Sequence, residues 1–251
     1  MSRAYPILNR PPIVEAVVDF DCDLPPGLEL AALKKAAREK FADLYPLAQP
    51  RLMQHVQVKA EADGTVNSSL NQGLEAFMFK QADQKQLVQV RKTGFSFNRL
   101  APYEGLETYL PEIERVWSLY REIARPVLVR SLRLRYINRI EIPFQVGPVD
   151  LDKYFKMHNM LVDDKNMTLT GFLSQYSAVE RATGSQVAVV LTAQNPEGDK
   201  LPIIFDNAAT ANVELEPMDW QGLLRALATL RDLKNRVFFG TVKQPCLDLF
   251  Q

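Results

Sequence analysis

The stretch that decides the fold is residues 130–142, which read RSLRLRYINRIEI. Apolar side chains occupy most of the alternate positions of this stretch, and arginines occupy several of the positions between them. Successive side chains of a β-strand point to opposite faces, so this alternation predicts a long strand with one buried face and one basic face. The buried face would carry Leu132, Leu134, Tyr136, Asn138, Ile140 and Ile142, and the other face Arg133, Arg135, Ile137, Arg139 and Glu141.

The rest of the chain gives a repeated order of elements around this strand. Period-2 alternation and short apolar runs predict strands, and apolar residues at helical spacing predict helices. Before the stretch, strands are predicted at 14–20, 52–60, 74–81 and 86–98, and helices at 30–44 and 106–123. After it come a short helix near 151–158, strands at 167–180, 186–193 and 203–214, and a last helix from Asp219. The chain therefore reads twice as strand, helix, three strands, helix, with an offset of about 117 residues.

This order of elements predicts the fold class. Strand runs joined by short turns favour antiparallel pairing, and one-sided amphipathic helices need a sheet to cover. We therefore predict an α+β protein in which a curved, mainly antiparallel sheet has the long helices packed on one face. Two β-α-β-β-β-α halves, 1–126 and 127–251, would then resemble the saddle of the TATA-binding-protein fold or a helix-grip cup, an analogy that carries no function. The alternative is two separate α+β domains divided near Pro126, but the lack of a flexible linker there favours a single compact domain over 1–251.

The composition is that of an ordinary globular protein. Of 251 residues, 47% are apolar and 24% are charged, and 30 basic residues balance 30 acidic ones. The zero net charge argues against nucleic acid and anionic membranes as partners, because both favour a basic excess. Two cysteines cannot build a disulfide framework, so a reducing compartment is expected. Residues 1–20 lack the apolar run of a signal peptide and no window is long enough for a spanning helix, so we expect a cytoplasmic protein.

The familiar catalytic motifs do not occur in the sequence. It contains no Gly-rich phosphate loop, dinucleotide fingerprint, nucleophile elbow or redox cysteine pair. The two histidines, His55 and His158, have no partner at i, i+4 spacing, so we expect no metal site and no cofactor. Cys22 lies between Asp21 and Asp23, whose negative charges would raise the pKa of the thiol and make it a poor nucleophile.

The arginines on the exposed face of 130–142 are the candidate binding residues. Arg133, Arg135 and Arg139 would stand in a line at spacings of about 7 and 14 Å, and guanidinium groups hold phosphate or carboxylate in bidentate fashion. With His55 and Lys59 contributed from neighbouring strands, this face would form a shallow basic surface that takes an anion. The alternative is structural, with the arginines paired to acidic side chains of adjacent strands such as Glu15, Asp19 or Glu75.

Two further features each allow two interpretations. A group of phenylalanines would either stack on the bases of single-stranded nucleic acid or fill the core, and the zero net charge favours the core. The group consists of Phe77, Phe79, Phe95 and Phe97. Asp206 follows the apolar run 201–205. It would either place a charge near the middle of the sheet or lie in a turn or a bulge, and we favour the turn or bulge, where Asp is common.

Two short motifs give a resemblance to a known group of proteins. The sequence NRPPIVEA occupies residues 9–16 and LRYINRI occupies 134–140, and the closing helix contains Trp220 and Phe238. Together these residues resemble a sporadically distributed bacterial family of uncharacterised proteins of about this length, with a P-I-V-E-A start and an L-R-Y-I-N-R-I middle. The activity of that family is unassigned, so the resemblance implies no catalytic residue. Its sporadic distribution hints at accessory or defence-related gene neighbourhoods.

Three functional hypotheses follow from these observations. The first is a non-catalytic binding or accessory protein that presents the arginine-bearing face to an anionic small molecule or a protein partner. The second is an enzyme that acts with carboxylates and arginines on a phosphorylated or nucleotide-like substrate. The third is a subunit of a larger assembly, for which self-association through an edge strand into a homodimer is the simplest form.

Overall fold

The stretch 130–142 lies in strand β6 (Leu128–Pro143), as its alternation predicts. The even-numbered side chains from Leu132 to Ile142 are buried, and the arginines between them are half-buried. The computed structural model describes the backbone of residues 5–60, 66–143, 149–156 and 171–251, and the side chains of the same residues except 53–74.

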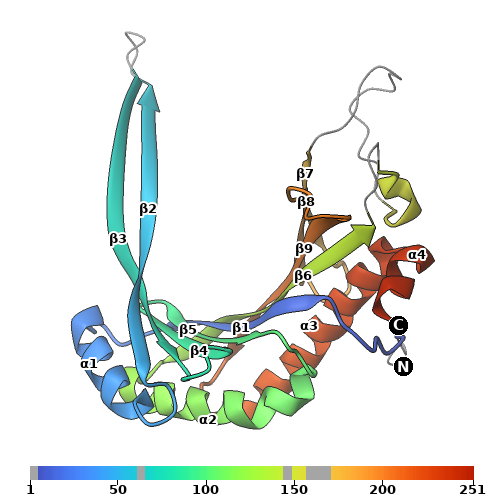
Figure 1. Ribbon diagram of the computed structural model, residues 1–251. Coiled ribbons are helices and arrows are strands. Elements are labelled where there is room, and N and C mark those ends of the chain that lie inside the picture. The colour runs from blue at the N-terminus through green and yellow to red at the C-terminus, as the bar shows by residue number, and fades with distance from the viewer. Residues whose placement is uncertain (1–4, 61–65, 144–148, 157–170) are drawn as a thin grey trace.

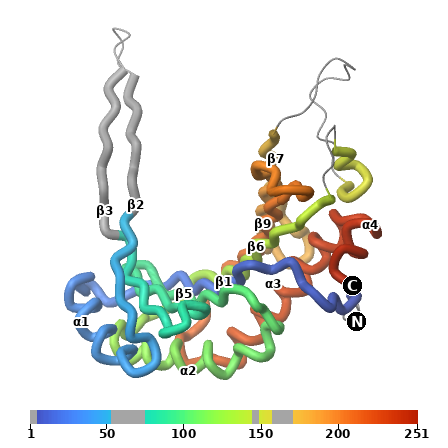
Figure 2. Tube along the Cα trace, in the orientation of Figure 1, coloured from blue at the N-terminus to red at the C-terminus, as the bar shows by residue number. Residues whose placement is uncertain are grey.

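Nine strands form one antiparallel sheet in the order β2-β3-β4-β5-β1-β6-β9-β8-β7. The other strands are β1 (Ile13–Asp23), β2 (Leu47–Ala60), β3 (Val66–Lys80), β4 (Gln86–Arg91), β5 (Gly94–Leu100), β7 (Leu173–Val179), β8 (Gln186–Ala193) and β9 (Lys200–Leu215). The helices are α1 (Leu30–Phe41), α2 (Leu106–Ala124), α3 (Trp220–Thr241) and α4 (Gln244–Leu247), with single 3₁₀ turns at Leu151–Lys153 and Asp248–Phe250. Figure 2 follows the chain through these elements.

The three long helices α1, α2 and α3 lie together on the convex face of the curved sheet (Figure 1). Helix α3 packs on β9 and β6, and α1 and α2 pack on each other and on β3, β4 and β5. The concave face carries none of these three helices. This arrangement confirms the predicted α+β class, with a curved antiparallel sheet and the long helices on one face.

Aromatic side chains fill the space between the sheet and α2. The Trp117 ring stacks on Phe20 with their centroids 4.6 Å apart, and Tyr120 lies 5.2 Å from Phe95. Four phenylalanines were expected either to stack on nucleic-acid bases or to fill the core. All four are buried in this core: Phe77, Phe79, Phe95 and Phe97. Because bases could not reach these rings, the core interpretation is confirmed for them.

Strands β1 and β6 join the two halves of the chain into one continuous sheet. They pair in antiparallel register, with Val18 opposite Leu134 and Phe20 opposite Leu132. The first strand of each half lies in this central pair, and the last strand of each half, β5 or β9, lies next to it. The strand order is therefore arranged in the same way on both sides of the β1–β6 pair.

The two halves depart from the predicted β-α-β-β-β-α pattern in two places. Residues 86–98, predicted as one strand, form β4 and β5, which are joined by a two-residue turn at Lys92 and Thr93. Gly94 follows that turn with a φ of 146°, a conformation that L side chains rarely adopt, and this lets the chain reverse. In the second half, the predicted helix near 151–158 is a single 3₁₀ turn, Leu151–Lys153, and His158 lies outside the described residues.

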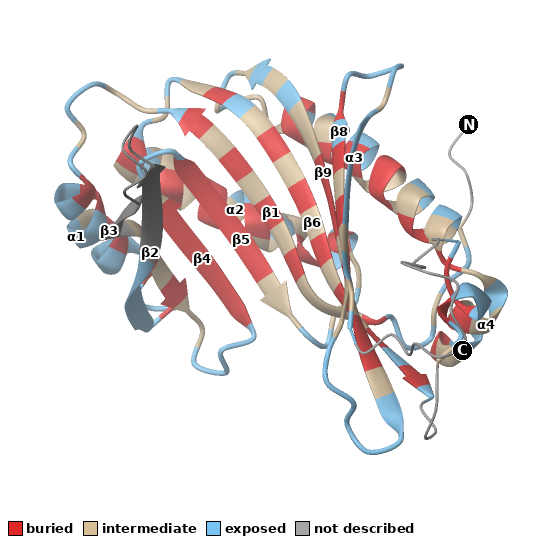
Figure 3. Ribbon diagram, turned by 90° about the horizontal axis from the view of Figure 1, so that it is seen from above, coloured by how far each residue is buried: buried red, intermediate tan, exposed pale blue. Residues whose placement is uncertain are grey.

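The exposure of the sheet residues sets up the candidate site. Seen from the concave side, buried and half-buried residues alternate along β1 and β6 (Figure 3). The buried residues face the helices, so the half-buried ones face the concavity. Asn138 is the one polar residue among the buried set of β6, and it donates a hydrogen bond to the Phe205 carbonyl of β9 over 2.9 Å, which satisfies its amide.

Candidate functional site: a polar pocket on the concave face

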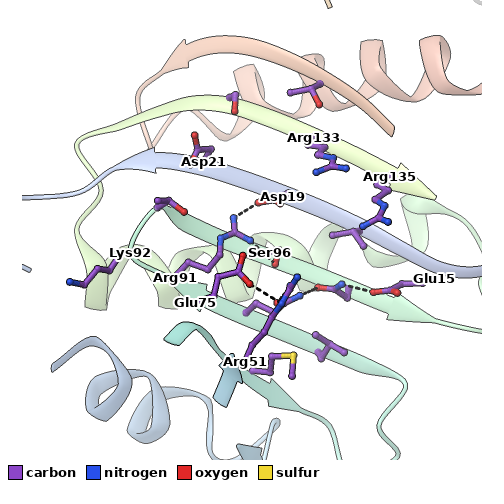
Figure 4. Close-up of a pocket in the computed structure, with 18 residues that line it drawn as sticks. Glu15, Asp19, Asp21, Arg51, Glu75, Arg91, Lys92, Ser96, Arg133 and Arg135 are labelled. Carbon is purple, nitrogen blue, oxygen red and sulfur yellow. Dashed lines mark hydrogen bonds and ion pairs between the residues drawn. The ribbon is translucent and has the colours of Figure 1, made fainter. Parts of the chain in front are cut away.

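A pocket of about 840 Å³ lies on the concave face, over β1, β4, β5 and β6 (Figure 4). This volume is in the upper part of the range for small-molecule sites. Five basic and four acidic side chains line it, together with amide, hydroxyl and a few apolar groups. The charged lining residues are Arg51, Arg91, Lys92, Arg133, Arg135, Glu15, Asp19, Asp21 and Glu75.

A chain of polar contacts crosses one side of this pocket. Arg51 forms an ion pair with Glu75 over 3.0 Å and donates a hydrogen bond to Gln89 Oε1 over 2.7 Å. The Gln89 amide donates to Asn98 Oδ1 over 3.0 Å, and the Asn98 amide donates to Glu15 Oε1 over 2.6 Å. Both amide side chains are about 95% buried, with exposures of 5% for Gln89 and 4% for Asn98. These contacts hold the Gln89 and Asn98 amides in one orientation.

A second ion pair lies next to this chain. Arg91 at the end of β4 pairs with Asp19 of β1, and it also donates a hydrogen bond to Ser96 Oγ over 3.3 Å. The side chains of Arg91 and Asp19 are only 13% and 25% exposed. This pair is thus built into the wall of the pocket.

Arg135 is held by a neighbouring strand. It forms a two-pronged pair with Asp206 of β9, in which Nε donates to Oδ1 over 2.8 Å and Nη2 donates to Oδ2. The hydrogen bond with Asp206 raises the pKa of Arg135 above its usual value. The expectation that Asp206 would sit in a turn or bulge is wrong, because it lies inside β9 directly opposite Ile137 of β6. Its place in the strand is explained by this pairing with a half-buried guanidinium.

Arg139 lies on the same face of β6 but does not line the pocket. Its guanidinium forms ion pairs with Glu141, at 3.5 Å, and with Glu197 of the loop that precedes β9. The structure thus brings Arg133 and Arg135 into one pocket and places Arg139 outside it.

Arg133 differs from the other arginines of this face. It lines the pocket, is half-buried, and has no hydrogen-bond or ion-pair partner among the residues that the structure describes. The register of the sheet places it directly opposite Asp19 of β1 and Thr210 of β9. Asp19 is already engaged by Arg91. Arg133 is therefore left with guanidinium donors that point into the pocket (Figure 4).

His55 and Lys59 stand apart from this group. Both lie in β2, but their side chains are outside the described part of the structure. Four strands, β3, β4, β5 and β1, separate β2 from β6 in the sheet, so these residues do not come from strands adjacent to the arginines. The expected basic surface is thus described only for its β6 part.

Several residues of the pocket were not singled out from the sequence. They are Arg51, Gln89, Arg91, Asn98 and Thr210. A signal for the β4 and β5 members was present, because polar residues alternate with valine or phenylalanine on both strands. This signal was missed because residues 86–98 were predicted as one continuous strand.

Cys22 and Cys246 are both free and buried. Burial raises the pKa of each thiol to about 12, and for Cys22 the charge of Asp21 adds to the effect. The predicted direction for Cys22 is confirmed, but burial is a larger cause than the neighbouring carboxylates on which the prediction rested.

A second polar cluster lies on the helix side of the sheet. Lys234 of α3 is 6% exposed, and its Nζ lies 3.5 Å from the centroid of the Tyr136 ring. Its backbone carbonyl accepts a hydrogen bond from the Asn207 amide over 2.9 Å, and Tyr136 shares a 2.6 Å hydrogen bond with Tyr103. Burial, with a smaller contribution from the charge of Arg231, lowers the pKa of Lys234 well below its usual value.

The described residues contain neither a cluster of metal-ligating side chains nor a helix that could cross a membrane. No three His, Cys, Asp or Glu side chains in these residues gather as they would to hold a metal ion. No helix in the same residues combines the length and the apolar character needed to cross a membrane.

Comparison with known proteins adds no relative. No protein-family model matches the chain, and no curated protein matches it at a significant level. The family resemblance of the NRPPIVEA and LRYINRI motifs therefore stays a prediction, and the function has to be argued from the pocket itself.

Proposed function

We propose that the protein binds an anionic ligand in the concave pocket and that Arg133 is the principal contact. The observation that carries this proposal is the difference between Arg133 and its neighbours. Arg51, Arg91 and Arg135 each hold a carboxylate of the chain, whereas Arg133 holds none among the described residues. A half-buried guanidinium without a partner is costly unless water or a ligand satisfies it, and it makes strong charge-assisted hydrogen bonds to an anion.

The surroundings of Arg133 support this proposal. Ser131 and Thr210 line the pocket next to it, and their hydroxyl groups have no hydrogen-bond partner among the described residues. The paired arginines and the buried amides keep the walls in one arrangement, so little order would have to be imposed when a ligand binds. Binding is favoured over catalysis because Asp19 and Asp21, the carboxylates opposite Arg133 and Ser131 in the sheet, are engaged by Arg91 and Arg130.

The proposal is tested with Arg133→Gln and a matched control. Arg139→Gln removes an arginine from the same face of the same strand, but outside the pocket. Small molecules that copurify with the protein from its host would be released by denaturation and compared by mass spectrometry among the three proteins. We expect an anionic compound to be present with wild type and Arg139→Gln and lost from Arg133→Gln.

The stability of the two variants separates binding from folding. Arg133→Gln should change the free energy of unfolding by no more than about 0.5 kcal/mol, as is usual for a surface substitution without an internal partner. Equal amounts of every anionic compound in wild type and Arg133→Gln, with both proteins folded, would refute the proposal.

A second candidate function, a subunit of a larger assembly, is favoured by the edge of the sheet. Strand β7 is the last strand, and no described residue pairs with its outer side. Leu173 and Val179 of this strand are 70% and 62% exposed, and an apolar groove of about 470 Å³ lies between β7, β8 and α3. Open edges with apolar side chains pair readily with another strand, and a second copy of this chain is the simplest partner.

The assembly candidate is tested by the oligomeric state. Size-exclusion chromatography with light scattering should give the mass of a dimer for wild type and of a monomer for Val179→Lys, because a charge on the edge opposes strand pairing. A monomeric wild-type protein over the accessible concentration range would remove the homodimer as the form of the assembly.

A further inference from the structure

The charged groups around Arg133 also indicate which anion the pocket would take, an inference that rests on the proposed function. We infer that the ligand presents a single carboxylate to Arg133, on an otherwise uncharged body, in preference to a phosphate.

The pocket already pairs arginines with carboxylates. Arg51 pairs with Glu75, Arg91 with Asp19, and Arg135 with Asp206. Every arginine of the pocket other than Arg133 is thus matched by one carboxylate. A ligand carboxylate on Arg133 completes the same series, with two parallel N–H···O bonds of the kind that Arg135 makes to Asp206.

The charges around Arg133 are close to balanced. The basic lining residues exceed the acidic ones by one, and Asp206, which lies beside Arg135, offsets that excess. Lys92, the remaining cation without a partner among the described residues, lies in the β4–β5 turn and points away from Arg133 (Figure 4). Because the charges are balanced, a ligand with more than one negative charge would bring an excess that no group of the pocket offsets.

Asp19 would repel a second negative charge on the ligand. This carboxylate lies opposite Arg133 in the register of β1 and β6 and is 25% exposed. A second negative charge on the ligand would face it across a partly desolvated pocket, where repulsion between like charges is stronger than in water. A phosphate monoester carries close to two charges at neutral pH, and a carboxylate carries one.

The rest of the pocket fits an uncharged ligand body. Val17, Met78 and Leu87 line it beside the polar groups. Two sources supply a carboxylate on such a body, a small organic acid and the C-terminus of a peptide chain. The shared chemistry is the carboxylate, and the test below separates the two.

The test compares matched probes on the purified protein. Hexanoate and hexyl phosphate have the same alkyl body and differ only in the head group. Each would be titrated at about pH 8, where the phosphate carries two charges, and at equal ionic strength. The readout is the Nε–Hε signal of Arg133 in NMR spectra of protein with labelled arginine, assigned by its absence from Arg133→Gln.

We expect hexanoate to bind more tightly than hexyl phosphate and to shift the Arg133 signal. Arg133→Gln should weaken its binding roughly 10- to 100-fold, the usual value of hydrogen bonds to a charged group. Arg139→Gln should leave the affinity unchanged. Arg133→Lys should recover only part of the affinity, because an ammonium lacks the planar fork.

The test distinguishes failure of the carboxylate preference from failure of the anion-binding function. Equal or tighter binding of hexyl phosphate at Arg133 would overturn the preference for carboxylate and leave the anion-binding function standing. No shift of the Arg133 signal with either probe would overturn both. A final arm uses an N-acetylated tripeptide, as the free acid and as the C-terminal amide. Binding of the free acid alone would identify a chain terminus as the source of the carboxylate. Binding of neither form would leave a small organic acid as the source. The preference for a carboxylate itself rests on the tighter binding of hexanoate.

Discussion

Replacing Gly94 by alanine tests the turn that separates β4 from β5. A Cβ atom built on Gly94 would lie 1.9 Å from the carbonyl oxygen of Phe20. Real Cβ atoms essentially never approach another heavy atom more closely than 3.0 Å. The atom that it meets is backbone of β1, the central strand, so it cannot turn aside as a flexible side chain would. Strands β1 and β5 would have to separate locally by at least about 1 Å.

The cost has two parts. Alanine at a φ of 146° is strained, which costs about 1–3 kcal/mol. Forcing an extra methyl group into a packed region costs about another 1–3 kcal/mol. We therefore expect Gly94→Ala to lower the free energy of unfolding by roughly 2–6 kcal/mol, a large share of the 5–15 kcal/mol that is typical for a folded protein.

Urea unfolding followed by circular dichroism measures this loss, and a thermal scan should show a fall in Tm of roughly 4–24 °C. Gly240→Ala is the matched control, because Gly240 lies in helix α3 with no atom within 4 Å of its built Cβ. That variant should gain up to about 1 kcal/mol from helix propensity. A loss below about 1 kcal/mol for Gly94→Ala would contradict the proposed close approach of the turn to β1.

Three other perturbations test separate parts of the molecule. Lys234→Met should raise the free energy of unfolding at neutral pH, because burial holds the pKa of Lys234 well below its usual 10.5. Between the folded and the unfolded pKa of Lys234, the unfolded chain binds a proton that the folded chain does not, so the stability of the wild type should rise with pH. The advantage of the variant should therefore shrink toward pH 10.5. A difference in stability that urea titrations show to be the same at every pH would count against this. Asp206→Asn should cost about 1–2 kcal/mol, since it leaves the half-buried guanidinium of Arg135 without its carboxylate, and an unchanged calorimetric Tm would show that the pair is not stabilising. Cys22 and Cys246, each with a pKa raised to about 12 by burial, should resist iodoacetamide at about pH 8 until urea unfolds the protein, and rapid labelling of the folded protein would be inconsistent with their buried positions.

The fold class could be predicted because the dominant signals are local. The alternation in 130–142 and the apolar stripe of α2 each lie within one element, and side-chain direction follows directly from the backbone period. The split of 86–98 was missed because the turn at Lys92 and Thr93 contains neither Pro nor Asn and is marked only by Gly94. The close approach of Gly94 to Phe20, which lies over 70 positions earlier in the chain, is a tertiary contact that the local pattern does not show.

The candidate site was less accessible to sequence reasoning because it depends on the pairing of strands. The parity of Arg133 and Arg135 is visible in the sequence, but the partner of Arg135 is set by the register of β6 against β9. The pairing of Asp19 with Arg91 likewise requires the order β4-β5-β1, in which Arg91 reaches across β5. Which arginine is left without a carboxylate follows only from all of these pairings together.

The pairing of β1 with β6 has a consequence during synthesis. Asp23 and its partner Leu128 are 105 positions apart, and Ile13 and Asn138 are 125 apart. At a translation rate of about 5–20 residues per second, one edge of β1 stays unpaired for roughly 5–25 s until β6 has been synthesised. Long-range strand pairing of this kind forms slowly, and the unpaired strand edge can associate with other chains until it has formed. We expect the newly made chain to depend on chaperones during this interval, although the finished sheet shields the same edge completely.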